Sequence, residues 1–373
     1  MIGETGMEAE GIRFERRGAL GLVTLDRPKA INALSHAMAL ALEAQLEDWA
    51  DDDRVATVAI RGAGEKAFCA GGDIRALYEA GRVDGAVDGR ANFAFYADEY
   101  RLNTLIKRFP KPYIAFMDGV VMGGGVGVSI HGARRVAGDA TLFAMPETGI
   151  GLFPDVGGTF FLPRLPGETG LWLALTGARL GPADAVAAGV CDLDIPAHRH
   201  DQAIRALEEA DFGASPEDAL TAVDWALNAF AREPEGATLP DLRAAIDRCF
   251  AGDSVDAVLT ALGSEGSDWA AKQRATILKK SPTSTRIAFR QLRMGATLDF
   301  EACMRLEYRL ARYCMTHPDF YEGVRATIID KDGAPRWRPA DLAEADEAHV
   351  APAFAPSPDV EELTLPGSPR ILR

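Results

Sequence analysis

The feature that most constrains this chain is a run of three glycines, Gly123, Gly124 and Gly125, between two segments of regular structure. Residues 113–117 are apolar and rich in strand formers, which predicts a buried strand, and residues 126–135 predict a helix. Because glycine has no Cβ, a ligand can come close to the backbone N–H groups here, and a helix N-terminus adds partial positive charge. The junction therefore predicts a site for a negatively charged oxygen.

A second junction of the same kind lies earlier in the chain. Residues 55–61 predict a β-branched strand, and the segment 67–73 (AFCAGGD) leads into a helix at 74–79. Residues 12–26 predict two strands, followed by a helix over 33–51. The N-terminal half therefore repeats a strand–strand–helix unit with glycine at its turns, which predicts an α/β fold.

Two carboxylates, Glu147 and Asp155, follow the glycines on a Gly/Pro-rich segment with apolar neighbours. A carboxylate in such surroundings is costly to bury unless it is paired or functional. Capping a helix or binding loop N–H groups is an equally good explanation from residue types alone. The upstream glycines favour a catalytic role, because acyl chemistry needs oxyanion donors together with an acid or base.

Composition excludes several classes of protein. A net charge of −15 and a pI near 4.9 argue against binding to nucleic acid or to an anionic membrane. The five cysteines are widely spaced and form no CxxC pair, which favours buried free thiols in a reducing compartment and gives no metal site. The first residues do not resemble a targeting peptide, and no apolar stretch has the length of a membrane span, so we expect a cytoplasmic protein.

Other catalytic motifs do not fit. The glycines do not have GxGxxG spacing, and there is no phosphate-binding GxxxxGK[ST]. Ser129 is not in a GxSxG nucleophile elbow, and it would not share a helical face with His131. His131 and the other histidines are interpreted as caps or surface residues.

The second half of the chain has a different composition. From about residue 198 it is rich in Ala, Leu, Glu and Asp with helical periodicity, and beyond residue 346 it is rich in Pro, Glu and Ala. We therefore predict a core over 12–197 that holds the site, a helical region over 198–345 and an extended tail over 346–373.

Taken together, these motifs resemble the crotonase (enoyl-CoA hydratase/isomerase) superfamily. The resemblance implies a spiral of repeated ββα units with a mostly helical C-terminal region. It makes the N–H groups of Gly72 and Gly124 the oxyanion hole, and it places Glu147 where the family has a catalytic acid. The residues that it implies for substrate and CoA binding are Arg27, Lys29, Ala70, Asp73, Ile74, Arg75, Gly123 and Lys331.

Within the superfamily, residues 145–158 and the stretch 307–332 are similar to the 3-hydroxyisobutyryl-CoA hydrolase subfamily. The resemblance implies hydrolysis of a 3-hydroxyacyl-CoA thioester in valine catabolism, with Glu147 as nucleophile or general base and Asp155 reading the acyl group. Hydratases carry a second catalytic Glu two residues after the glycine triplet, where this chain has Gly127. Because hydration needs both an acid and a base, this departure disfavours it.

Two alternatives stay open from the sequence. An enoyl-CoA isomerase or hydratase of the same superfamily is one, and a non-catalytic acyl-CoA-binding protein is the other. In each case the expected partner is an acyl-CoA rather than nucleic acid or a membrane. No cofactor or metal is expected, since CoA is part of the substrate, and the superfamily's preference for trimers suggests a homo-oligomer.

Overall fold

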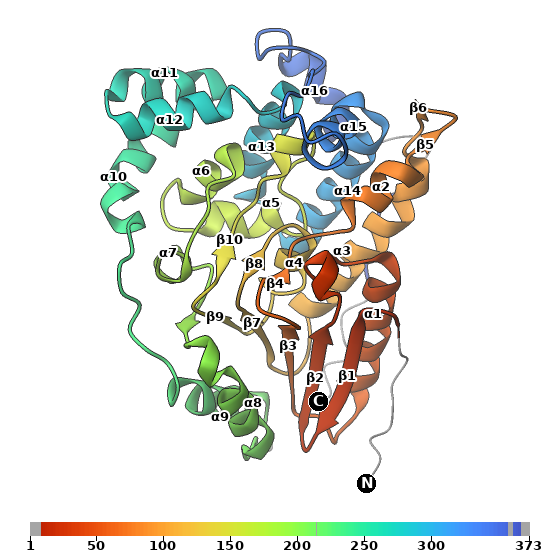
Figure 1. Cartoon of the computed structure of the whole chain (residues 1–373), viewed down its shortest axis with the longest axis vertical. Helices are drawn as coiled ribbons and strands as arrows, with labels where there is room; N and C mark the ends of the chain where they lie inside the picture. Colours follow the sequence, from red (N-terminus) through yellow and green to blue (C-terminus); the bar gives the residue numbers. More distant parts are fainter. Residues whose placement is uncertain (1–8, 214, 357–360, 367–373) are drawn as a thin grey trace.

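The computed structural model describes residues 9–213, 215–356 and 361–366. Its central feature is a six-stranded sheet with the order β1-β2-β3-β7-β9-β11 (Figure 1). β1 and β2 are antiparallel, and the other neighbouring strands are parallel. These strands are β1 (Ile12–Arg17), β2 (Leu20–Leu25), β3 (Thr57–Gly62), β7 (Tyr113–Met117), β9 (Arg134–Ala137) and β11 (Leu193–Asp194).

A smaller parallel sheet with the order β10-β8-β4 continues the strands of the large one. It comprises β4 (Ala67–Cys69), β8 (Val120–Val121) and β10 (Leu142–Phe143). Thus β3 leads to β4 and the helix α2 (Ile74–Ala80), while β7 leads to β8 and the short helix α4 (Gly124–Gly127). The predicted repeat of two strands and a helix, with glycine at the turn, is confirmed.

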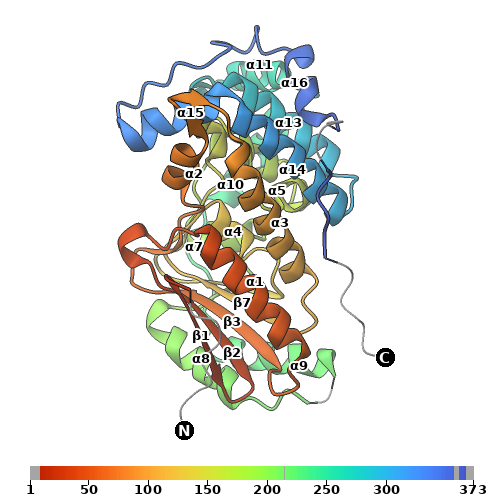
Figure 2. The ribbon, with the colours of Figure 1, turned by 90° about the vertical axis from the view of Figure 1, so that its right-hand side faces the viewer.

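The two faces of the large sheet are covered by different helices (Figure 2). One face packs against α8 (His200–Glu209) and α9 (Pro216–Asn228) in a small apolar core. The other face belongs to the main core, with α1 (His36–Asp51) and α3 (Phe93–Lys107). Because both faces are covered, the central strands are continuous apolar runs; every residue of β2 is buried.

Of the remaining helices, α11 to α16 form the upper part of the molecule in Figure 1. The α-helices are α5 (Gly158–Phe161), α6 (Thr169–Thr176), α7 (Pro182–Ala187), α10 (Leu239–Phe250), α11 (Val255–Glu265), α12 (Asp268–Ile277), α13 (Pro282–Gly295), α14 (Phe300–Thr316), α15 (Pro318–Val324) and α16 (Glu347–Phe354). The short 3-10 helices are η1 (Pro28–Ala30), η2 (Arg90–Asn92), η3 (Glu147–Ile150), η4 (Leu162–Arg164) and η5 (Ala197–Arg199), and a π-helical turn, η6, spans Arg325–Ile329.

One apolar core joins the two predicted regions. It contains side chains of the large sheet as well as Ile287 of α13, Leu310 of α14 and Phe320 of α15. The boundary near residue 197 therefore marks a change in secondary structure rather than a break in packing. The division of the chain into separate units at that boundary stays a prediction.

Two sequence-based predictions are wrong in detail. The helix predicted over 126–135 ends at Gly127, because Arg134–Ala137 is instead a strand paired with β7. The tail predicted to be extended begins with α16, in which the Asp346 side chain accepts a hydrogen bond from the N–H of His349. Val350 and Phe354, one helical turn apart, are buried against the core.

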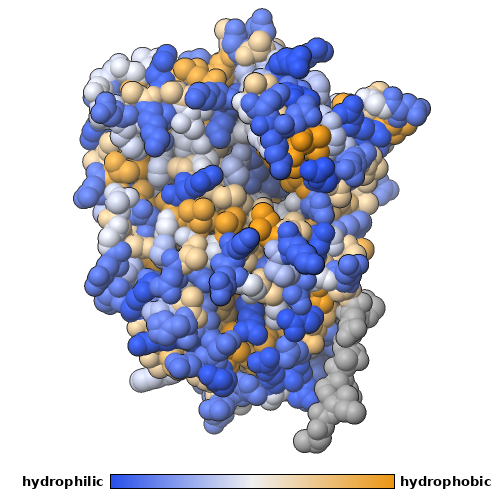
Figure 3. Space-filling view, viewed as in Figure 1, coloured by the Kyte–Doolittle hydropathy of each residue, from blue (hydrophilic) through white to orange (hydrophobic). Residues whose placement is uncertain are grey.

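The surface is largely hydrophilic on the face shown in Figure 3. The small hairpin of β5 (Arg82–Val83) and β6 (Ala86–Val87) projects at the edge of this view. Val83 and Val87 are exposed on it. Among the described residues, no helix is both long and apolar enough to cross a membrane.

Candidate active site

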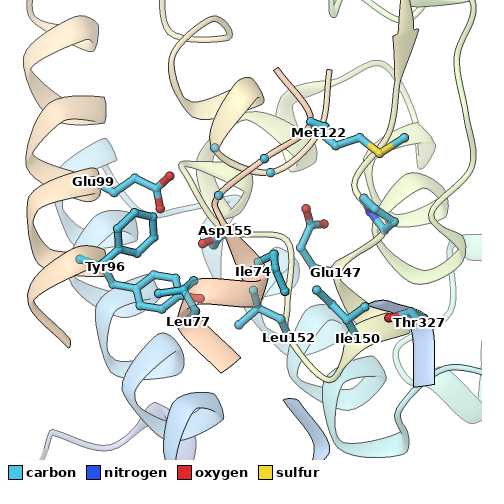
Figure 4. A pocket seen from close by; sticks show the side chains of 18 of the residues that line it. Ile74, Leu77, Tyr96, Glu99, Met122, Glu147, Ile150, Leu152, Asp155 and Thr327 are labelled. Carbon is cyan, nitrogen blue, oxygen red and sulfur yellow. The ribbon is translucent and has the colours of Figure 1, made fainter. Parts of the chain in front are cut away.

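A cavity of about 340 Å³ lies where β4 and β8 end and their helices begin. Five parts of the chain enclose it: the two glycine junctions, α3, the segment around η3 and the C-terminal helical region (Figure 4). Its lining is Ala70, Gly71, Gly72, Ile74, Leu77, Phe95, Tyr96, Glu99, Met122, Gly123, Gly124, Pro146, Glu147, Gly149, Ile150, Leu152, Asp155, Lys280 and Thr327.

The two glycine junctions meet in this cavity, as the resemblance implied. A Cβ built on Gly124 would lie 3.3 Å from the backbone nitrogen of Gly72. Among the described residues, the N–H groups of Gly72 and Gly124 donate none of the hydrogen bonds of turns and loops. Gly124 is the first residue of α4, so its N–H has no acceptor within that helix either. Gly123, at φ 46° and ψ −125°, turns the chain to expose the second N–H. Two backbone donors therefore face one space.

Glu147 is the first residue of η3, and its side chain is 4% exposed. Burial raises the pKa of this carboxyl well above its usual range, and the nearby Asp155 carboxylate raises it further. Its Oε2 has no hydrogen-bond partner among the described residues. An unpartnered carboxyl oxygen at the wall of a cavity is available for a substrate or a water.

Asp155 lies in the loop between η3 and α5 and is also buried. The hydroxyl of Tyr100 donates a hydrogen bond of 2.9 Å to its Oδ2. Burial raises the pKa of Asp155 to about 7, although the Tyr100 hydrogen bond acts in the opposite direction. In Figure 4 the side chains of Glu147 and Asp155 lie on neighbouring parts of the same cavity wall.

Sequence reasoning missed a third acid, Glu99, on α3. It is 2% exposed, and its Oε1 has no partner among the described residues. Burial raises its pKa well above the usual range, with further contributions from Asp155 and Glu307. The signal was present in the sequence: Tyr96, Glu99 and Asn103 occupy one helical face that is otherwise apolar.

Gly127 is enclosed rather than open toward the cavity. A Cβ added to it would lie 2.7 Å from Nδ2 of Asn103 and 2.9 Å from Cβ of Val156. The absence of a carboxylate here is therefore built into the packing. However, Glu99 supplies a second carboxyl group to the cavity from another element. Glycine at position 127 therefore does not leave Glu147 without a second acid for hydration.

The structure divides the residues predicted to bind substrate and CoA. Ala70, Ile74 and Gly123 line the cavity, as do all four residues predicted to be catalytic. Arg27 and Asp73 do not line it; they form an ion pair of 3.1 Å, in which Asp73 also caps α2.

Lys29, Arg75 and Lys331 are exposed and do not line the cavity either. Arg75 reaches the C-terminal region, where its Nη2 donates to the carbonyl oxygen of Ile328 at 3.4 Å. Arg75 therefore contacts the segment that leads to Lys331. Lys29 lies on η1.

Two further predictions concern groups outside the cavity. All five cysteines are free and buried, as predicted. His131 was interpreted as a cap or surface residue, which is wrong: it is 7% exposed and its Nε2 bonds the carbonyl oxygen of Val156 at 2.7 Å. Among the described residues, no group of three or more His, Cys, Asp or Glu side chains is placed to hold a metal ion.

Comparison with known proteins places this geometry in a family. The profile of the enoyl-CoA hydratase/isomerase family matches residues 20–354. The chain belongs to this family, which has the crotonase fold. The 3-hydroxyisobutyryl-CoA hydrolase, mitochondrial, of Danio rerio is 44% identical over 359 residues, 95% of this chain and 91% of that protein. The protein of the same name from Homo sapiens is 42% identical over 344 residues, 91% of this chain and 87% of that one.

Two solved structures share the whole fold. A carnitinyl-CoA dehydratase from Mycobacterium thermoresistibile has a TM-score of 0.86 at 42% identity, covering 96% of this chain and all of that one. An enoyl-CoA hydratase from Rhodobacter sphaeroides has a TM-score of 0.84 at 36% identity, covering 95% and 100%. The relatives are thus named for two kinds of reaction, hydrolysis of an acyl-CoA and addition or removal of water. The hydrolases are named as mitochondrial, and the cytoplasmic location predicted for this chain stays a prediction.

Proposed function

We propose that this chain hydrolyses 3-hydroxyacyl-CoA thioesters, with 3-hydroxyisobutyryl-CoA as its main substrate. The observation that carries the proposal is the buried carboxyl of Glu147, whose Oε2 has no partner among the described residues, in the same cavity as the N–H groups of Gly72 and Gly124. The relatives named as 3-hydroxyisobutyryl-CoA hydrolases support this choice of substrate over more than nine-tenths of the chain.

The thioester oxygen would accept hydrogen bonds from Gly72 and Gly124. These bonds strengthen as the carbonyl carbon becomes tetrahedral and negative charge gathers on its oxygen. One donor of this kind is typically worth about 3 kcal/mol of barrier. Since backbone groups supply the charge stabilisation, we propose that the reaction needs no cofactor or metal.

The position of Glu147 supports two routes. As a nucleophile, its carboxylate attacks the carbonyl carbon, the C–S bond breaks, and CoA leaves as a thiolate that takes up a proton; water then cleaves the mixed anhydride. As a general base, Glu147 takes a proton from water while that water attacks. Either route ends with a free hydroxy acid and CoA. Trapping the anhydride with hydroxylamine separates the two routes.

Asp155 and Glu99 would read the acyl group. Both are buried and line the cavity, and a 3-hydroxyl group there can donate to either carboxyl. A site built to bond a hydroxyl strongly rejects an analogue that lacks one, because its buried polar group is left unpaired. We therefore expect isobutyryl-CoA to be a poor substrate.

Hydration of an enoyl-CoA is the second candidate, and Glu99 is the observation that favours it. With Glu147 it supplies two carboxyl groups, as acid–base addition of water to a double bond requires. Against it, the space at Gly127 is filled by Asn103 and Val156.

The phosphates of CoA would be bound outside the cavity. Arg75 and Lys331 are our candidates, because they are exposed and lie near one segment. In this acidic chain such a local basic cluster is what a phosphate ligand requires. Valine catabolism as the pathway and a homo-oligomeric state are parts of the same proposal.

The test is a parallel assay of the purified protein. With 3-hydroxyisobutyryl-CoA and a thiol reagent, we expect release of free CoA; with crotonyl-CoA, we expect no loss of enoyl absorbance. Hydration without CoA release would overturn the hydrolase proposal in favour of the second candidate. Binding of both esters without turnover would indicate a non-catalytic acyl-CoA-binding protein.

A further inference from the structure

Glu307, on α14, is a buried acid that lies outside the cavity and has no role in the steps above. Its side chain is 0% exposed. Its Oε2 accepts a hydrogen bond of 2.8 Å from the N–H of Gly157, and its Oε1 accepts one of 2.8 Å from the N–H of Thr159. Both carboxyl oxygens thus accept hydrogen bonds from one short stretch of backbone, whose two donors lie 150 and 148 residues earlier in the sequence.

That stretch directly follows Asp155 and has an unusual conformation. Val156 has φ 52° and Gly157 has φ 90°, so two consecutive residues are left-handed. For a β-branched residue such as Val156 this region is strained, and it persists only where the surroundings hold it. The reversal of the chain at these two residues sets the direction in which Asp155 points.

Two further side chains hold the carbonyl groups on either side of Asp155. His131 bonds the carbonyl oxygen of Val156, and Nε2 of Gln291 donates to the carbonyl oxygen of Pro154. Glu307 is the partner of the N–H groups, and its two hydrogen bonds are charge-assisted when it is ionised. Burying a carboxylate is costly, so its retention beneath this turn points to a function.

We propose that Glu307 is a positioning residue, which holds the left-handed turn at Val156 and Gly157 and thereby aims the Asp155 carboxyl into the cavity. This inference rests on the proposed function for its activity readout. It also gives the helical C-terminal region a part in the site, because α14 reaches the loop that carries Asp155.

The ionisable groups that act on Glu307 are acidic or neutral. Asp155 on the loop, Glu99 and Tyr100 on α3, and Cys303 one turn earlier on α14 all interact with it electrostatically. Burial, followed by the Asp155 charge, raises the pKa of Glu307 to about 8, while the two N–H groups favour its ionised form.

The experiment compares Glu307→Gln with Glu301→Gln, a matched change on the same helix at a carboxylate paired with Arg108. For Glu307→Gln we expect kcat on 3-hydroxyisobutyryl-CoA to fall by on the order of 10²-fold, as for a misplaced catalytic group, with little change in KM. For Glu301→Gln we expect less than about a twofold change.

Unchanged kcat in a folded Glu307→Gln protein would overturn the proposal. If that variant does not fold, Glu307→Asp keeps the carboxyl group but draws it back by one methylene. We then expect a similar loss of kcat with little change in KM, and a fully active Glu307→Asp would contradict the inference.

If the wild-type protein releases no CoA, the proposed function is wrong, but the positioning role of Glu307 can still be tested. The deciding measurement is then a crystal structure of Glu307→Gln. We expect Val156 to return to negative φ and Asp155 to turn away from the cavity. An unchanged turn would contradict the inference.

Discussion

The sheet face covered by α8 and α9 and the cavity beside α3 are equally buried, yet they hold opposite kinds of side chain. The first has an apolar cluster that includes Leu22, Ile114 and Phe116. The second contains three carboxyl groups, and two of them have an unpartnered oxygen among the described residues. The apolar side chains of the first region stabilise the folded state. The buried carboxyl groups of the second region destabilise it, and a reaction or a ligand explains their presence. Four substitutions test this division.

The largest effect is expected for Glu147→Gln in the cavity. The amide has nearly the shape of the acid but is neither a nucleophile nor a base, so turnover should fall by at least about 10³-fold, or about 4 kcal/mol of barrier. Steady-state kinetics with 3-hydroxyisobutyryl-CoA measures the loss. Binding of the ester, followed by calorimetry, should persist. Wild-type turnover in this variant would remove Glu147 from the mechanism.

The next effect is on stability and lies on the other side of the comparison. Phe116→Ala leaves a void in the apolar face, and we expect the free energy of unfolding to fall by about 3–5 kcal/mol. Denaturant unfolding measures it. Because Phe116 is remote from the cavity, kcat of the folded fraction should be unchanged; a specific loss of kcat would break the division between the two regions.

Gly124→Ala tests the oxyanion hole. Its Cβ would lie 2.6 Å from Oε1 of Glu99 and 3.3 Å from the nitrogen of Gly72. Both the donor and the acid must then shift, and we expect kcat to fall by about 10²-fold, in the range seen when one such donor is lost. Gly181→Ala, at a site with open space for a Cβ, is the control. Equal kinetics of the two variants would contradict the assignment of Gly124.

The smallest of the four effects concerns pH and Asp155. Its folded pKa of about 7 lies above the ordinary value of 3.8 for an aspartate, so between these values the folded state holds a proton that the unfolded state has lost. Its contribution to stability is therefore present at low pH and is lost as pH rises to about 7. Between about pH 5.5 and pH 8 this amounts to about 2 kcal/mol.

Asp155→Asn should remove this part of the pH dependence, so the variant should gain stability relative to wild type as pH rises. Unfolding at the two pH values measures the gain. Asp201→Asn, at an exposed carboxyl of α8, should leave the wild-type pH dependence in place. If Asp155→Asn behaves like that control, the burial of Asp155 has no energetic consequence.

Local patterns were sufficient to predict much of the fold. The apolar strands, the helix predicted over 33–51 and the glycine turns each depend on a few neighbouring residues, and the structure has them in place. The helix predicted after Gly125 was wrong because pairing with β7, a contact between distant parts of the chain, decided the conformation of Arg134–Ala137. Local propensity carries no information about such pairing.

The same limit applies to the candidate site. Gly72, Gly124, Glu147 and Asp155 lie in motifs, so the sequence was enough to single them out, and the cavity contains all four. Glu99 follows no glycine and belongs to no motif, and only the packing of α3 against α4 brings it to the cavity. Arg27 was predicted from its motif alone, and the sequence could not reveal that Asp73 engages its guanidinium.

Asn103 and Val156, which fill the space beside Gly127, restrict how this chain could change its reaction in evolution. A single mutation that installs a glutamate at position 127 meets both side chains before its carboxyl reaches the cavity. The near atom of Asn103 ends a flexible side chain, but Cβ of Val156 is fixed to the left-handed turn that follows Asp155. A route from this chain to a hydratase with a second glutamate at position 127 therefore also requires a change at Val156, in the turn that carries Asp155.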